Sequence, residues 1–186
     1  MTFKVISRFV VFWICCAPIH LFAQQKELIS RLYTMKDGLP DQLVNSVMQD
    51  SHGFIWVATS SGLSKFDGMR FTTYRNNPSS TNSLRSNQVS SVLEDKMGRI
   101  WIGHPQGLDL FDPRTERFYF HWPDSGSKIN SFDVSTLRER RDGKIWICTT
   151  QGVYLAEPES LNIEKFPQIP RETADIGETD DCSVDA

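Results

Sequence analysis

The chain has 186 residues, with 20 Lys and Arg against 23 Asp and Glu, and a formal charge of -3. A protein that binds nucleic acid through its phosphates needs a basic excess, so this composition excludes a nucleic-acid partner. Aromatic residues make up 11% of the chain, and this content favours a packed core over disorder.

Residues 1–23 have the order of a secretory signal peptide. Two basic residues, Lys4 and Arg8, precede an apolar run that ends at Ala17, and Ala23 is followed by a polar chain. We expect cleavage after Ala23 and a periplasmic product. A membrane anchor is the alternative, but a span needs ~20 apolar residues and this run has about half that number.

The remaining chain contains one pattern three times, with a period of 45 residues. Large aromatic, glycine and valine positions all keep this period: Trp56, Trp101 and Trp146; Gly53, Gly98 and Gly143; Gly62, Gly107 and Gly152; Val44, Val89 and Val134. A repeat of this size is typical of the blades of a β-propeller.

Each repeat has the pattern of four short strands. In the first repeat we expect strands around Val44, over 54–59, over 63–66 and over 71–74, because these segments are rich in β-branched and aromatic residues. No segment carries an apolar stripe of helical period. The predicted fold is all-β: a partial β-propeller of three four-stranded antiparallel blades in an incomplete ring.

The repeats divide the chain into six segments. They are a signal peptide at 1–23, an N-terminal strand and lead-in at 24–42, blades at 43–83, 84–128 and 129–166, and an acidic tail at 167–186. Asp181–Asp185 resembles the opening strand of another repeat, so the tail is the possible start of a truncated fourth blade. Since repeat units stack on their neighbours, we expect the uncovered end faces to promote self-association.

Turn chemistry explains two of the recurring residue types. Asp50 and Asp95 each begin a four-residue turn where a carboxylate can accept backbone hydrogen bonds, and Gly53 can adopt positive φ at its end. The third repeat has Arg140 in place of the aspartate, which predicts a different hydrogen-bond pattern there.

The recurring tryptophans are predicted to pack between blades. A large aromatic side chain at a fixed height buries ~150–250 Å² against the next blade, which explains Trp56, Trp101 and Trp146 without any chemistry. A platform for sugars is the alternative. Trp122 lies outside the register and is expected to be more exposed.

Two cysteines remain after export, Cys148 and Cys182. An oxidising compartment would permit a bridge between them. However, Cys148 occupies the repeat position of Ala58 and Gly103, which favours a small buried residue over a bridge.

No catalytic, cofactor or metal site is nominated. His52 and His104 are not paired with ligands at metal spacing and are expected to be surface or packing residues. No nucleophile, phosphate-loop or dinucleotide motif is present. The polar loops over 76–83 and 123–128 can carry recognition or can be plain connections, and no ligand-binding residue is identified.

Several of these residues together resemble a known family. Asp37-Gly-Leu-Pro40, the run from Asp50 to Val57, Gly62-Leu63 and Phe66-Asp67-Gly68 are similar to the two-component regulator propeller repeat, over about residues 30–166. The resemblance implies a periplasmic sensor region, commonly of Bacteroidetes, that precedes a β-sandwich domain, a membrane helix and a histidine kinase. Many such proteins sense glycans and control polysaccharide-use genes.

The predicted function is therefore the ligand-sensing part of a two-component signalling protein, without catalytic activity of its own. Its expected partners are an oligosaccharide and the missing blades or kinase portion of a longer parent protein. The alternatives are a vestigial or structural fragment, or part of a propeller lyase or hydrolase.

Overall fold

The computed structural model describes residues 30–122 and 132–167. The chain divides into two compact units, and of the first, Met1–Leu32, only residues 30–32 are described. All the regular structure described below belongs to the second unit, Tyr33–Ala186. Within the described residues, no helix has the length and apolar character needed to cross a membrane.

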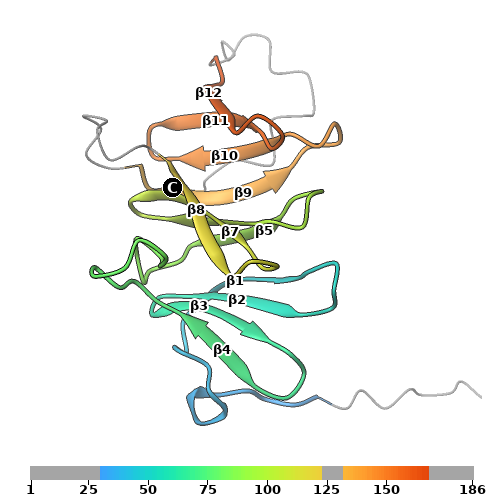
Figure 1. Cartoon of the computed structure of the whole chain (residues 1–186), viewed down its shortest axis with the longest axis vertical. Helices are drawn as coiled ribbons and strands as arrows, with labels where there is room; N and C mark the ends of the chain where they lie inside the picture. Colours follow the sequence, from blue (N-terminus) through green and yellow to red (C-terminus); the bar gives the residue numbers. More distant parts are fainter. Residues whose placement is uncertain (1–29, 123–131, 168–186) are drawn as a thin grey trace, which may run out of the picture. The chain divides into compact units, whose positions relative to one another are not determined.

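Twelve strands of the second unit form three four-stranded antiparallel sheets (Figure 1). The first sheet contains β1 (Val44–Gln49), β2 (Ile55–Thr59), β3 (Gly62–Phe66) and β4 (Phe71–Tyr74). The second contains β5 (Ser91–Glu94), β6 (Ile100–His104), β7 (Gly107–Asp112) and β8 (Arg117–Trp122). The third contains β9 (Val134–Glu139), β10 (Ile145–Thr149), β11 (Gly152–Glu157) and β12 (Asn162–Lys165). The predicted fold class is confirmed.

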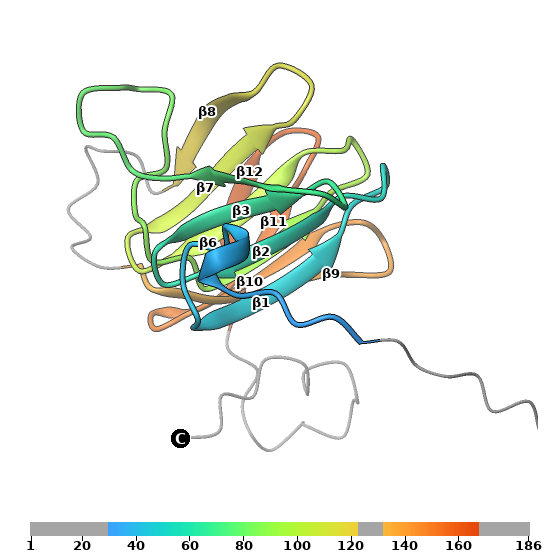
Figure 2. The ribbon, with the colours of Figure 1, turned by 90° about the horizontal axis from the view of Figure 1, so that it is seen from below.

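In each sheet the strands pair in chain order, so every neighbouring pair is joined by one connection. The first strands of successive sheets are close to one another, because β5 contacts both β1 and β9. Seen along the stack of sheets, β1 and β9 lie on the same side (Figure 2). This arrangement turns one face of each sheet toward the next sheet along the chain.

Two apolar clusters fill the spaces between the sheets. The first joins Trp56, Ala58 and Leu63 of the first sheet to Ile100, Ile102 and Phe111 of the second. The second joins Trp101, Leu108 and Leu110 of the second sheet to Ile145, Ile147 and Ala156 of the third. Apolar side chains in such an interface are removed from water on both sides, and this burial is the main force that holds the sheets together.

The described part of the lead-in contains no strand. Residues 30–42 contain no strand, and instead include one 3-10 helix, η1 (Met35–Asp37); residues 24–29 lie outside the described part. Thr34 caps this helix by accepting a hydrogen bond from Lys36 N, and Asp37 accepts one from Thr34 N at 2.8 Å. These local bonds satisfy the backbone without a strand partner, which explains why no strand forms.

Candidate functional site: the interfaces between repeats

The aspartate of the first repeat bonds both its turn and its tryptophan. Asp50 Oδ1 accepts hydrogen bonds from His52 N at 3.0 Å and Phe54 N at 2.9 Å. Its second oxygen, Oδ2, accepts a hydrogen bond from Trp56 Nε1 at 2.8 Å. One carboxylate therefore shapes the β1–β2 turn and fixes the indole that enters the next interface.

The second repeat has the same arrangement and adds a cation. Asp95 Oδ2 lies 2.8 Å from Trp101 Nε1, and also accepts hydrogen bonds from the guanidinium of Arg99. Arg99 is only 8% exposed, and its Nη2 also donates to the carbonyl oxygen of Pro158, in the turn that follows β11. The turn role of these aspartates was predicted, but their bond to tryptophan was missed. Its sequence signal is an aspartate six residues before the tryptophan in both repeats.

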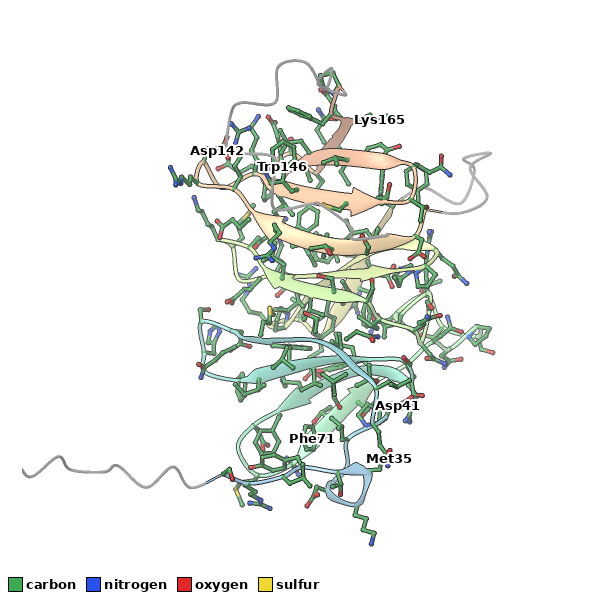
Figure 3. All side chains as sticks on the ribbon, turned by 180° about the vertical axis from the view of Figure 1, so that it is seen from behind. Met35, Asp41, Phe71, Asp142, Trp146 and Lys165 are labelled. Atoms are coloured by element: carbon green, nitrogen blue, oxygen red, sulfur yellow. The ribbon has the colours of Figure 1, made fainter. Side chains whose placement is uncertain are left out.

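Arg140 changes the side-chain bonds of the third repeat and leaves its backbone turn intact. Arg140 N donates to Lys144 O and Gly143 N donates to Arg140 O, as in the other two turns. The guanidinium lies over the Trp146 ring at 5.5 Å, and Asp142 accepts a bond from Lys144 N instead (Figure 3). The predicted change of pattern is therefore limited to side chains.

The three tryptophans are not equally buried. Trp56 and Trp101 are fully buried between sheets, whereas Trp146 is half-buried and contacts Phe166 edge-on at 4.8 Å. Trp146 lies on the face of the third sheet that no other described sheet covers. The expectation that all three indoles lie between blades is wrong for Trp146 within the described residues.

The recurring glycines all have the left-handed backbone that tight turns require. Their φ angles are 89°, 75° and 88° for Gly53, Gly98 and Gly143, and 136°, 128° and 118° for Gly62, Gly107 and Gly152. Gly62 has a second constraint, because a Cβ there would lie 2.7 Å from the carbonyl oxygen of Tyr74. These turns set the register in which each tryptophan strand pairs.

An aromatic cluster occupies the first interface. Tyr74 stacks on Trp56 with ring centroids 5.8 Å apart, and lies 4.9 Å from Phe111 of the second sheet. Phe111 is in turn 4.8 Å from Phe118. Burial, and secondarily the charge of Glu116, raise the pKa of Tyr74 to about 12.

Trp122 is more exposed than Trp56 and Trp101, as predicted, but it still takes part in the second interface. It is half-buried and lies 4.5 Å from Phe132 and 5.0 Å from Tyr154, both edge-on. Trp122 pairs with Leu108 as Tyr74 pairs with Leu63, so the two residues are structural equivalents. Counting one 45-residue period from Tyr74 does not reach Trp122, because the β7–β8 pair contains a register shift and a longer turn.

Polar contacts also recur between neighbouring sheets. Ser51 donates from its backbone N and its Oγ to the carboxylate of Glu94, each at 2.7 Å. One repeat later, Lys96 Nζ lies 3.8 Å from Glu139. Each contact joins the first turn of one sheet to the end of the first strand of the next, so the register between sheets is held by charge as well as by packing.

His104 is a buried packing residue, which is one of the two roles predicted for it. His104 and Asp109 are both fully buried, with Nε2 and Oδ1 3.2 Å apart. This is an ion-pair distance without the angle of a hydrogen bond, and Gln106 N donates to Nδ1 at 3.2 Å. His52 is exposed in its turn. Within residues 30–122 and 132–167, no three His, Cys, Asp or Glu side chains are grouped to hold a metal ion.

The polar loop over 76–83 is ordered by its own hydrogen bonds. Asn76 Nδ2 donates to Leu84 O at 2.6 Å and Arg85 O at 2.9 Å. Asn82 Oδ1 accepts a bond from Phe118 N at 2.8 Å, which fastens the loop to β8. The loop over 123–128 lies outside the described residues.

Cys148 is buried, with 3% of its surface exposed, as its repeat position predicts. It is also disulfide-bonded, so the expectation that favoured a simple small residue over a bridge is wrong. The cysteine to which it is bonded lies outside the described residues.

Comparisons with known proteins bear on these interfaces. The family model described as two component regulator propeller matches residues 38–61 and 83–106. A histidine kinase of Formosa agariphila is 39% identical over 79 residues, which are 42% of this chain and 6% of that protein.

Solved structures share the fold. The extracellular domain of a putative hybrid two component system from B. thetaiotaomicron matches with a TM-score of 0.58 and 23% identity, over 79% of this chain and 19% of that one. Virginiamycin B lyase from Staphylococcus aureus matches with a TM-score of 0.53 and 17% identity, over 72% of this chain and 43% of that one. The chain thus spans a small part of these relatives' length.

Both family matches begin at a lead-in and end just after a tryptophan strand, β2 or β6. They therefore include the aspartate, turn and indole that build each interface. The model of the two-component regulator propeller family thus matches repeat segments in the first and second of the three sheets.

Proposed function

We propose that the chain is part of an extracytoplasmic, ligand-sensing propeller of a two-component signalling protein and has no catalytic activity of its own. The observation that carries the proposal is the family match at residues 38–61 and 83–106. The identity with a histidine kinase over 79 residues supports the same assignment.

The proposed location is the periplasm. The order of residues 1–23, basic and then apolar and then small, supports export with cleavage after Ala23. Sequencing of the amino terminus of the chain recovered from the periplasm is expected to begin at Gln24. Recovery of an uncleaved, membrane-bound chain would contradict this location.

The proposed ligand is an oligosaccharide, and the loop over 76–83 is its proposed recognition surface. Asn77, Ser79, Thr81 and Asn82 are exposed on this loop, and amides and hydroxyls complement sugar hydroxyl groups. The bonds made by Asn76 hold the loop in one conformation before any ligand arrives. Such preorganisation lowers the entropic cost of binding.

Thermal unfolding of the exported chain in the presence of a panel of oligosaccharides tests this proposal. We expect one class of glycan to raise Tm and the paired change Ser79→Ala, Thr81→Ala to abolish that rise. Neither hydroxyl takes part in the hydrogen bonds described for this loop, so the variant should fold. Thr72→Ala, at an exposed position on β4, is the matched control.

Two other outcomes of this experiment would favour the alternative functions. A panel without any Tm shift would contradict glycan sensing and favour a structural or vestigial role. Release of glycan fragments during incubation would favour the propeller lyase or hydrolase alternative, for which the Staphylococcus aureus likeness supports only a shared fold.

The proposed protein partners are further propeller blades and a kinase portion. Trp146 lies half-buried on a face that no described sheet covers, which supports a role for additional repeats there. In isolation this face is expected to cause self-association, measurable as a concentration-dependent mass by light scattering.

A further inference from the structure

At both described interfaces, the small residue two positions after the tryptophan contacts the first valine of the next repeat. Ala58 and Val89 are fully buried in the same cluster. A Cβ on Gly103 would lie 2.6 Å from Val134 Cγ1 and 3.3 Å from Val134 Cβ. Adjacent repeats therefore bring these two positions close together across each interface.

In the third repeat this small residue is Cys148, which is buried and disulfide-bonded. Disulfide geometry requires Cβ atoms about 3.5–4.5 Å apart. The 3.3 Å between the Gly103 Cβ position and Val134 Cβ is close to this range. A cysteine at the valine position of a following repeat would therefore lie within bonding reach of Cys148.

The sequence places a cysteine near that position. The interval from small residue to valine is 31 residues in the first two repeats, and Cys182 follows Cys148 after 34 residues. Ser183 comes next, as Ser90 follows Val89 and Ser135 follows Val134. A connection three residues longer would keep the register, since connections vary in length more readily than strands.

The residue equivalent to Asn45 and Ser90 bonds differently in the third repeat. Asn45 and Ser90 donate across the described interfaces to the carbonyl oxygens of Val89 and Val134. Ser135, at the same repeat position, instead donates to Cys148 O of its own sheet at 3.2 Å.

Charge on this side of the third sheet complements the tail. Arg138 pairs with Trp146 across β9 and β10 and so shares its face, and Arg140 lies over the indole. The segment over 178–185 carries four carboxylates and no basic residue.

We propose that residues 182–185 form the first strand of a fourth repeat on the Trp146 face of the third sheet, held there by a Cys148–Cys182 disulfide. Formation of the bond removes two protons and two electrons from the two thiols. A disulfide oxidant of the export compartment accepts them and becomes two thiols. The disulfide would stabilise the end of the repeat array, where Trp146 is half-buried.

Peptide mapping without reduction tests the bond in the full chain recovered from the periplasm. Trypsin should leave residues 145–165 linked to residues 172–186, and reduction should separate them. A link from Cys148 to a peptide containing Cys15 or Cys16, a link between two chains through Cys148, or a free Cys182 thiol would overturn the proposal.

Hydrogen exchange tests the docking apart from the bond. The variant Cys148→Ala, Cys182→Val reproduces the Ala58–Val89 pair, so backbone amides at 182–185 should exchange about tenfold or more slowly than in an unstructured chain. The same protection is expected in the unsubstituted chain. Unprotected exchange of these amides in both proteins would show that the cysteine only tethers a loose tail, and would overturn the fourth-strand proposal.

Discussion

The indole Nε1 of Trp101 lies 2.8 Å from Oδ2 of Asp95, the same oxygen that accepts the guanidinium of Arg99. Asp95 is 6% exposed and Arg99 is 8% exposed. The carboxylate therefore compensates two buried donors, one of them charged, and shapes a turn through its other oxygen. In the first repeat, Asp50 performs the same work without a cation, because Phe54 stands where Arg99 does.

The first prediction compares these two aspartates. Asp95→Ala should lower the free energy of unfolding by about 3–5 kcal/mol, because it leaves Arg99 buried and uncompensated. Asp50→Ala should cost less, about 1–3 kcal/mol, because it leaves only neutral donors unsatisfied. Urea unfolding monitored by circular dichroism measures both. Equal losses would contradict the assigned role of Arg99.

A second prediction concerns the repeat in which Arg140 replaces the aspartate. Arg140→Asp should place an acceptor near Trp146 Nε1 and near the backbone N atoms of the turn, each hydrogen bond contributing about 0.5–1.5 kcal/mol. The change also removes the contact between the guanidinium and the indole, worth about 0.5–1 kcal/mol at an exposed site. We expect a net gain of about 1 kcal/mol in the free energy of unfolding.

Arg141→Asp is the matched control for this substitution. It makes the same change of charge at the neighbouring residue, which is exposed. Position 141 is not the repeat position of Asp50 and Asp95, so an aspartate there should not restore their turn bonds. A gain of similar size in Arg141→Asp would mean that net charge, rather than the restored hydrogen bonds, stabilises the protein.

The third prediction concerns the close approach of Gly103 and Val134. Gly103→Ala should cost about 1–3 kcal/mol through overpacking, because its Cβ would lie 2.6 Å from Val134 Cγ1. Val134→Ala leaves a cavity when it stands alone, but the added methyl of Gly103→Ala should partly fill that space. A double-mutant cycle by urea unfolding should therefore give a favourable coupling of about 0.5–3 kcal/mol. Additive losses would contradict the contact.

The sequence was informative about these interfaces to different degrees. The period placed the strands of the first repeat within a residue of the observed bounds at 55–59, 62–66 and 71–74, because alternation and turn residues act locally. The Asp95–Trp101 bond was missed because a turn role already explained the aspartate, although the six-residue spacing shared with Asp50 and Trp56 was a signal for it. The period also did not show that Trp122 is equivalent to Tyr74, because a strand irregularity and a longer turn change the residue count without changing the place in the sheet.

The lead-in and Cys148 show a different limit. The sequence did not predict η1 in the described part of the lead-in, 30–42, where Thr34 and Asp37 satisfy the helix locally. For Cys148, one repeat position is compatible with both a small buried residue and half of a disulfide. The position of a residue in the repeat therefore indicates the size of side chain that fits there, and does not indicate whether a cysteine there forms a disulfide.

The last prediction uses the pKa of Tyr74, raised to about 12 by burial and then by Glu116. An unfolded tyrosine has a pKa of about 10, so above this pH the unfolded chain loses a proton that the folded chain retains. The stabilising contribution is complete below about pH 10 and should be lost as the pH rises toward about 12. Tyr74→Phe removes this ionisation, so its urea midpoint should fall less than that of the unsubstituted chain between pH 9 and pH 11. The difference between the two midpoints at pH 8 provides the baseline, and parallel decline of both proteins would contradict a buried, protonated phenol between Trp56 and Phe111.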